Sequence, residues 1–270
     1  MVRMLSVFAA LVIFLAAMGK NEAPARDTPE RRDRSTTGEP APELTALLRA
    51  YPDVLLSAAE NKLVWKDGTV MIYDDGVPDK PFRALLESPD LEDQMSMAYP
   101  RGEAAVPAEN HDPGRVRCEP FFLKMYGSTR EQVEGNLTVI QWMPACSSVQ
   151  LPVTRVNGVH LRLEQVSDEL DRLPRSLTKY VNRPAGTYAW RYIEGTRRLS
   201  PHSFGIAVDI NLEHADYWRW HAAGPAADLT YRNRIPLRIV EIFEEQGFIW
   251  GGRWHHYDTM HFEYRPELLP

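Results

Sequence analysis

Two short stretches of this chain alternate apolar and polar residues with the period of a β-strand. In residues 205–211 one face is apolar and the other small or polar: Ile206, Val208 and Ile210 against Ala207, Asp209 and Asn211. Residues 258–264 repeat the pattern, with Met260, Phe262 and Tyr264 against His261 and Glu263. We therefore predict two strands, each with one apolar face and one face that carries polar side chains.

The remaining pattern mixes helices and strands without a regular βαβ alternation. We expect a helix that begins at Ser128 as N-cap and a helix from Pro236 that stops at Gly247. The other expected elements are a helix over 44–50, a hairpin over 62–75, an irregular segment over 76–115, a strand over 137–142, a helix over 165–173 and strands over 188–192 and 248–250. This mixture predicts an α+β fold, with a small antiparallel sheet and flanking helices.

The polar residues on the first two strands suggest metal chemistry. A carboxylate such as Asp209 is costly to bury in an apolar strand unless a positive charge meets it. His202, just before that strand, and His261 on the second strand can supply two imidazole nitrogens. Two histidines and one aspartate leave a tetrahedral Zn²⁺ with one open position, as in catalytic sites. Asp258, three residues before His261, could then accept a proton from water.

These residues form two motifs, S-x-H-x-x-G-x-A-x-D from Ser200 to Asp209 and acid-x-x-H from Asp258 to His261. Together they resemble the M15 family of zinc D,D-carboxypeptidases and endopeptidases, the VanY-like peptidases that cut bacterial cell-wall peptides. The resemblance covers roughly residues 155–265 and includes Trp190-Arg191. It implies that His202, Asp209 and His261 bind zinc, that Asp258 is the general base and that Arg191 stabilises the oxyanion. Several members have Glu in place of Asp258, and the shorter acid is more similar to the endopeptidase branch.

The N-terminus predicts export. Residues 1–19 combine Arg3, an apolar run and the small-x-small site Ala17-Met18-Gly19, as in a secretory signal. An uncleaved membrane anchor is the alternative. Residues 20–43 are polar and rich in proline and charge, which is typical of a disordered tether. We expect residues 44–154 to pack on or extend a catalytic domain at 155–270, in a periplasmic or extracellular monomer.

Composition and cysteine count add two expectations. The chain has 31 basic and 37 acidic residues and a net charge of −6, which argues against a nucleic-acid partner. In an oxidising compartment Cys118 and Cys146 could form a disulfide, worth about 3–4 kcal/mol. Two free thiols are the alternative.

Several other residues have an open role. Arg198 and Arg253 could bind a substrate carboxylate or form ordinary ion pairs. His255 and His256 could contact substrate or lie in a solvated loop. Four tryptophans could line a peptide or glycan groove or belong to the core: Trp218, Trp220, Trp250 and Trp254.

The sequence therefore predicts a zinc metallopeptidase that acts on peptidoglycan stem peptides, at either a D-Ala–D-Ala or an L-Ala–D-Glu bond. The alternative is a zinc-containing cell-wall binding protein without turnover. The presence of both Asp258 and Arg191 favours the enzyme, because a protein without turnover needs neither.

Overall fold

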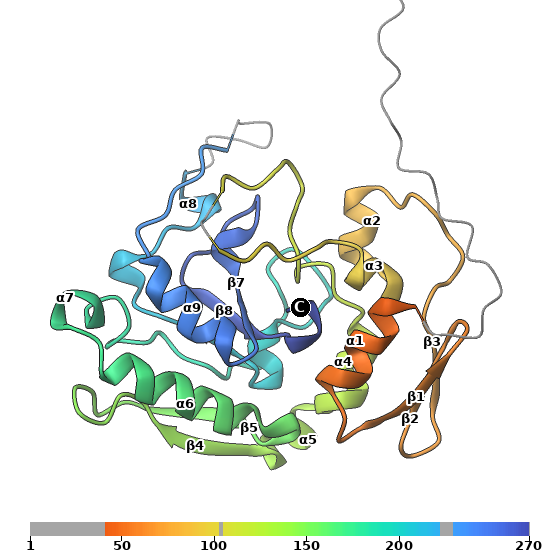
Figure 1. Cartoon of the computed structure of the whole chain (residues 1–270), viewed down its shortest axis with the longest axis horizontal. Coiled ribbons are helices and arrows are strands. Elements are labelled where there is room, and N and C mark those ends of the chain that lie inside the picture. The colour runs from red at the N-terminus through yellow and green to blue at the C-terminus, as the bar shows by residue number, and fades with distance from the viewer. Residues whose placement is uncertain (1–40, 103–104, 222–228, 270) are drawn as a thin grey trace, which may run out of the picture. The chain divides into compact units, whose positions relative to one another are not determined.

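A computed structural model describes residues 41–102, 105–221 and 229–269. Within these residues short helices combine with three small antiparallel sheets (Figure 1), so the predicted α+β class is confirmed. The predicted signal at residues 1–19 and most of the tether at 20–43 lie outside the described residues. No helix within the described ranges is long and apolar enough to cross a membrane.

The first part of the fold is a helix followed by a three-stranded sheet. Helix α1 (Pro42–Ala50) precedes strands β1 (Leu55–Ala59), β2 (Lys62–Trp65) and β3 (Val70–Ile72), which pair in that order. The β2–β3 pairing confirms the predicted hairpin, whereas β1 was not predicted.

The expectation of an irregular segment over 76–115 is wrong in part, because two short helices form there. These are α2 (Phe82–Glu87) and α3 (Leu91–Met95). Helix α3 begins with a capping box, in which the side chain of Asp90 accepts from the backbone of Asp93 and the side chain of Asp93 accepts from the backbone of Asp90.

The middle of the chain forms several helices and a two-stranded sheet. It contains α4 (Glu119–Tyr126), α5 (Arg130–Gly135), β4 (Leu137–Gln141), β5 (Gln150–Thr154), η1 (Val156–Gly158), α6 (Val159–Asp171) and α7 (Arg175–Thr178). The N-cap of α5 is Thr129, whose hydroxyl accepts from Gln132 N, so the prediction of Ser128 is wrong by one residue. The strand predicted over 188–192 does not form. Only an isolated bridge between Tyr192 and Leu199 occurs there.

The C-terminal part contains the sheet of the two alternating stretches. Its elements are η2 (Pro201–Phe204), β6 (Ala207–Asp209), η3 (Leu212–His214), α8 (Trp218–His221), α9 (Leu237–Glu245), β7 (Phe248–Trp250), η4 (Gly251–Arg253), β8 (His261–Tyr264) and η5 (Pro266–Leu268). The strand order is β6-β8-β7, with both pairs antiparallel. Both predicted strands form but are shorter than expected, because Gly205 ends η2 in the left-handed conformation, Asn211 caps η3, and residues 258–260 lie outside β8.

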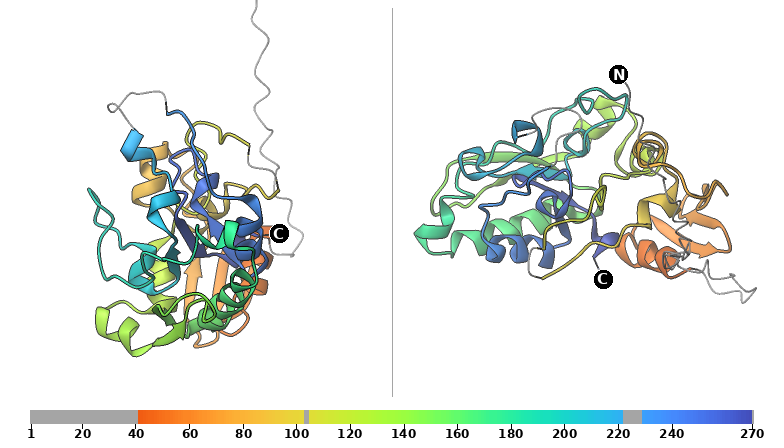
Figure 2. Two further views of the ribbon diagram at one scale, coloured as in Figure 1. Left: turned by 90° about the vertical axis from the view of Figure 1, so that its left-hand side faces the viewer. Right: turned by 90° about the horizontal axis from the view of Figure 1, so that it is seen from above.

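A large hydrophobic core joins these elements, and a smaller buried cluster contains Ile249, Trp254 and Leu268. Helix α9 packs on β7, and α6 lies between α9 and the β4–β5 pair (Figure 1). Phe243 of α9 stacks on Phe262 of β8 with ring centroids 3.8 Å apart. The large core also includes Leu44 and Leu47 of α1. In the right-hand view of Figure 2, β1–β3 (orange) and α7 (green) lie at opposite ends, with β6–β8 (blue) between them.

The predicted disulfide is wrong, because Cys118 and Cys146 are both free. Cys118 is buried at the N-cap of α4, where its backbone N–H donates to Gln94 Oε1 at 2.9 Å. Cys146 is exposed after β4, with its sulfur 3.0 Å from Asp171 Oδ1 on α6. The two thiols therefore belong to different local environments, one in the core and one at the surface.

Candidate metal centre and active site

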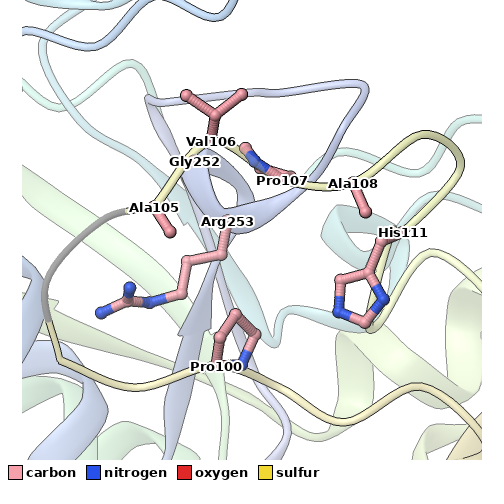
Figure 3. A pocket seen from close by; sticks show the side chains of 8 residues that line it. All are labelled: Pro100, Ala105, Val106, Pro107, Ala108, His111, Gly252 and Arg253. Carbon is pink, nitrogen blue, oxygen red and sulfur yellow. The ribbon is translucent and has the colours of Figure 1, made fainter.

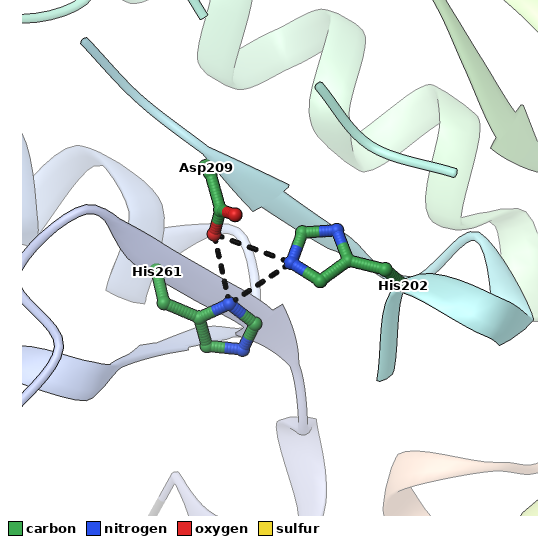
Figure 4. A group of neighbouring side chains, drawn as sticks. All are labelled: His202, Asp209 and His261. Atoms are coloured by element: carbon green, nitrogen blue, oxygen red, sulfur yellow. Dashed lines mark hydrogen bonds and ion pairs between the residues drawn. The ribbon is translucent and has the colours of Figure 1, made fainter. Parts of the chain in front are cut away.

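Three side chains from separate elements converge on one point in the C-terminal sheet (Figure 4). His202 comes from η2, Asp209 from the end of β6 and His261 from the start of β8. His202 Nε2 lies 3.2 Å from Asp209 Oδ1 and 3.2 Å from His261 Nδ1, and the last two atoms are 3.0 Å apart. The three predicted ligand residues are thus adjacent, although 59 positions separate the two histidines.

Strand register explains why two of these side chains meet. Asp209 and His261 are directly opposite each other in the antiparallel β6–β8 ladder. Side chains at such positions project to the same face with their Cβ atoms about 5 Å apart. The alternation that places apolar residues in the core therefore places both ligands on the other face.

The turn that precedes β6 fixes the third side chain. Ser200 caps η2 by accepting from His202 N at 3.4 Å, and Gly205 ends it in the left-handed conformation at φ +67°. A Cβ at Gly205 would lie 2.8 Å from Leu137 Cδ2 and 3.1 Å from Thr154 N, both in the β4–β5 sheet. Only glycine fits both the backbone angle and this close approach, so the turn requires it.

The far side of each imidazole ring has a hydrogen-bond acceptor. His202 Nδ1 donates to the backbone carbonyl of Thr187 at 2.7 Å, which leaves the lone pair of Nε2 facing Asp209 and His261. His261 Nε2 lies 3.2 Å from Glu263 Oε2 and donates to that carboxylate. Outer partners of this kind fix the tautomer and orientation of metal-binding histidines.

Glu263 is kept ionised by its surroundings. Burial alone would raise the pKa of this carboxyl, but the hydrogen bond from His261 and the charges of Arg265 and Arg117 lower it to about 2. Arg265 Nη1 donates to Glu263 Oε1 at 2.9 Å, and Arg117 Nη1 is 3.7 Å from Oε2.

Burial likewise opposes ionisation of Asp209, yet the nearby imidazoles bring its pKa far below the usual range.

The donor set and its spacing fit a zinc ion. Zinc takes nitrogen and oxygen ligands at about 2.0–2.1 Å, so neighbouring tetrahedral ligands are about 3.3 Å apart. The 3.0–3.2 Å separations of the three atoms are close to that value. His202, Asp209 and His261 could therefore hold a metal in nearly their present positions.

Asp258 lines the same pocket as the three metal-directed residues, a cavity of about 370 Å³. Its Oδ1 atom is buried and has no hydrogen-bond partner among the described residues. Burial, reinforced by the charge of Asp209, raises the pKa of this carboxyl to about 6 although His261 lowers it. The loop backbone is held by Asp258 N, which donates to Gly251 O at 2.9 Å. A Cβ at Gly251 would lie 2.5 Å from Asp258 O, so glycine permits this approach.

Arg191 also lines this pocket, and its side chain is exposed. Its backbone is tied to η2, because Arg191 N donates to Ser203 Oγ at 2.9 Å and Arg191 O accepts from Ser200 N at 3.0 Å. These bonds keep the arginine beside the turn that carries His202. All five residues assigned by resemblance therefore face one cavity.

Other residues reach the pocket from elsewhere in the chain, and the sequence motifs do not indicate them. Arg115, Arg117, Tyr217 and Arg219 line it, together with Arg198 and two of the four tryptophans, Trp220 and Trp254. Trp250 is part of the core instead. No local signal marks Arg115 or Arg117, because their proximity to the site arises only from the tertiary fold.

His256 is not among the residues that line this pocket, and its imidazole is paired with Asp112 instead. Its Nδ1 lies 2.6 Å from Asp112 Oδ2 and its backbone N donates to Asp112 Oδ1 at 2.9 Å. Neighbouring bonds join the same two segments, since His255 N donates to His111 O at 3.0 Å and Arg115 Nη1 to His256 O at 3.0 Å. Segment 111–115 thus clamps the loop that carries Asp258.

Arg253 does not reach the pocket of the metal-directed residues. It lines a separate cavity of about 250 Å³ with mostly apolar neighbours (Figure 3). Its side chain is buried and donates to Glu244 at 2.8 Å. Arg253 therefore forms an ordinary ion pair. Of the two arginines considered for the substrate carboxylate, only Arg198 faces the site.

Comparison with known protein families gives one match. Residues 194–264 match a family described as D-alanyl-D-alanine carboxypeptidase, within the M15 peptidases. This segment contains His202, Asp209, Asp258 and His261, and it leaves out Arg191 and Arg115. The match confirms the resemblance inferred from the two motifs over residues 194–264, and the rest of the expected range, 155–193, stays a prediction. No curated protein sequence matches the chain.

Proposed function

We propose that this chain, whose residues 194–264 match a family of M15 peptidases, is an exported zinc peptidase that hydrolyses bonds in peptidoglycan stem peptides. The observation that carries the proposal is the convergence of His202 Nε2, Asp209 Oδ1 and His261 Nδ1 in a pocket that also contains Asp258. A structural zinc site would need no such neighbour. An acid with a partnerless buried oxygen has a clear use in proton transfer.

Each residue of the chain has a distinct role in this proposal. His202, Asp209 and His261 hold the ion, which when bound supplies the Lewis acidity that activates water and polarises the scissile carbonyl. Asp258 accepts the proton of the attacking water and then donates it to the amine that leaves. Thr187 and Glu263 keep the two imidazole rings oriented. Arg191, an exposed cation at the rim, stabilises the negative charge that develops on the carbonyl oxygen.

The raised pKa of Asp258 supports its role as base. A carboxyl with a pKa near 6 is ionised at pH 7 and yet holds a proton well enough to return it to the leaving group. The partnerless Oδ1 also means that no other side chain among the described residues occupies the proton-accepting atom. Both properties follow from burial in the loop between η4 and β8.

Two bonds are candidates, D-Ala–D-Ala and L-Ala–D-Glu. Mass spectrometry of purified muropeptides, incubated with the zinc-loaded protein with and without a chelator, identifies the bond from the mass lost. We expect cleavage of one bond that the chelator abolishes. A protein that holds zinc and binds muropeptides but leaves every bond intact would instead be a cell-wall binding protein without turnover.

Export is tested separately. Expression in a bacterium followed by N-terminal sequencing of the secreted or periplasmic protein should show cleavage after Gly19. A protein that stays in the membrane fraction with an intact N-terminus would favour the uncleaved anchor.

A further inference from the structure

The pocket around the metal-directed residues contains five arginines: Arg115, Arg117, Arg191, Arg198 and Arg219. Arg219 is paired with Glu194 at 2.9 Å. Arg117 and Arg115 have only distant carboxylates, at 3.7 Å from Glu263 and 3.8 Å from Asp112. Within the described ranges, Arg191 and Arg198 have no carboxylate inside the 4.0 Å of an ion pair. Four carboxylates also line the cavity, those of Glu194, Asp209, Asp258 and Glu263, but none of them forms an ion pair with Arg191 or Arg198.

In the described part of the chain, Arg198 is the arginine of this pocket whose guanidinium most clearly lacks a partner for one of its N–H groups. It is half-buried, and its Nη1 donates to the carbonyl of Arg115 at 3.3 Å. Its Nε is buried and has no acceptor among the described residues. A buried N–H without an acceptor is costly, and a guanidinium N–H more so. A ligand with acceptor oxygens would satisfy it.

The backbone holds these arginines together. Arg117 Nη2 donates to the carbonyl of Leu199 at 2.9 Å, and Arg198 Nη1 donates in return to the carbonyl of Arg115. One arginine hydrogen bond therefore runs in each direction between segments 115–117 and 198–199. The guanidinium group of Arg198 is repelled by that of Arg115 and repels that of Arg117 across this contact. Burial, and then the charge of Arg115, lowers the pKa of Arg198, and burial with the charges of Arg198 and Arg265 lowers that of Arg117 to about 10 despite Glu263. An anion bound between them would relieve this repulsion.

We propose that Arg115 and Arg198, backed by the buried charge of Arg117, bind a carboxylate of the substrate close to the scissile bond. The inference rests on the proposed peptidase function and adds a substrate requirement to it. A planar guanidinium binds a carboxylate through two parallel hydrogen bonds, which makes arginine the suitable residue. Both candidate bonds have such a group nearby, the C-terminal carboxylate after D-Ala–D-Ala and the α-carboxylate of a γ-linked D-glutamate after L-Ala.

The subsite is built partly from outside the family segment. Arg198 belongs to residues 194–264, but Arg115 and Arg117 lie in the portion before them. This gives residues 44–154 a part in substrate selection, beyond their contribution to the core.

The test uses matched peptides that differ in one group. For each candidate bond, one stem peptide has the free carboxylate and its partner has the carboxamide, which has nearly the same shape and no charge. Cleavage by the zinc-loaded wild type gives kcat/KM for each pair. Calorimetry with the zinc-loaded Asp258→Asn variant gives Kd for each pair without turnover. We expect the carboxylate peptide of the cleaved bond to be preferred about tenfold to hundredfold in both measurements, as for a charge-assisted hydrogen bond.

Two variants assign the preference to the subsite. Arg198→Gln should reduce the preference to within about threefold, whereas Arg219→Gln, the matched control in the same pocket, should keep it because Arg219 is already paired with Glu194. Arg198→Lys keeps the charge but loses the planar guanidinium, so its preference for the carboxylate peptide should lie between those of Arg198→Gln and Arg219→Gln. Zinc content and thermal melting of each variant verify that the fold is intact.

The outcomes separate this inference from the function on which it rests. A wild type that cleaves carboxylate and carboxamide peptides equally would overturn the subsite and leave the peptidase intact. A preference that survives Arg198→Gln would also overturn it. If no peptide is cleaved, the peptidase proposal fails, and calorimetry still decides whether the carboxylate is recognised.

Discussion

The carboxylate of Glu263 lies 3.2 Å from Nε2 of His261, two positions earlier on strand β8. Residues i and i+2 of a strand project to the same face, so this contact follows directly from the strand. The opposite ring nitrogen, Nδ1, faces Asp209. Glu263 therefore acts through the orientation of a metal-directed imidazole, and its bond with the buried Arg265 anchors that carboxylate.

We predict that Glu263→Gln weakens zinc binding about tenfold to hundredfold without abolishing it, because the ring loses its charged acceptor. Competition with a chromogenic chelator measures the affinity. Glu241→Gln, at a half-exposed glutamate of α9, is the matched control and should bind zinc as the wild type does. Equal zinc affinity of the two variants would show that Glu263 does not contribute to metal binding.

His202→Ala or His261→Ala should abolish zinc binding near neutral pH, because each leaves only two ligands. In the metal-free chain, burial disfavours the charged ring of His261, but hydrogen bonds to Asp209 and Glu263 raise its pKa to about 10. Proton and metal compete for this ring, so affinity should fall as the pH is lowered. Metal analysis after dialysis at pH 8 and pH 6 tests both points, and full occupancy in either variant would refute the ligand set.

The Asp112–His256 pair makes a prediction about stability. Burial favours the neutral form of Asp112, but the hydrogen bond from His256 and the charge of Arg115 lower its pKa below the usual value. A lowered pKa stabilises the fold above the unfolded value of about 3.9, and this contribution is lost as pH falls further. Asp112→Asn should therefore reduce the free energy of unfolding by about 1–3 kcal/mol at pH 7.

Urea denaturation of the two proteins between pH 3 and pH 7 measures this difference, which should shrink below about pH 4. Asp168→Asn, an exposed position on α6, should change little across the range. A difference for Asp112→Asn that is constant with pH would show that the carboxylate charge is not what stabilises the loop.

The pH dependence of cleavage should follow the protonation of Asp258, the proposed general base. Burial raises the pKa of Asp258 to about 6, and a base is inactive once protonated. The value of kcat/KM should therefore fall about tenfold for each pH unit below about 6. Zinc content measured in the same samples separates this loss from loss of metal. A flat profile down to pH 4.5 with full zinc occupancy would exclude Asp258 as the base.

The sequence predicted the site best where the functional residues follow the alternating pattern of a strand. The ligands on β6 and β8 were predictable because one pattern fixes both the buried face and the side that carries Asp209 and His261. The ends of these strands were not predictable, because Gly205 ends the preceding 3₁₀ turn and Asn211 caps the following one, which leaves only residues 207–209 in β6. Helix α3 had a local signal, the Asp90–Asp93 capping box, which the proline-rich and glycine-rich surroundings obscured.

Contacts between distant segments could not be predicted outside the two motifs that carry His202, Asp209 and His261. Nothing near Thr187 indicates that its carbonyl orients His202, and nothing near Arg115 indicates a pocket at residue 198. The disulfide failed for a related reason. An oxidising compartment permits a bond between Cys118 and Cys146, but only the fold decides whether the two sulfurs meet.

The most direct test of the central claim compares two nearly isosteric substitutions, Asp258→Asn and Asp209→Asn. Asp258→Asn removes the proton acceptor and no metal ligand, so zinc content should stay near the wild-type level while muropeptide cleavage falls at least about 10²-fold. Asp209→Asn removes a charged ligand and should weaken zinc binding itself. Zinc content and cleavage rate, measured on the same samples, give the answer. Retained zinc with lost cleavage in Asp258→Asn is the predicted result, and cleavage at the wild-type rate in that variant would contradict the account.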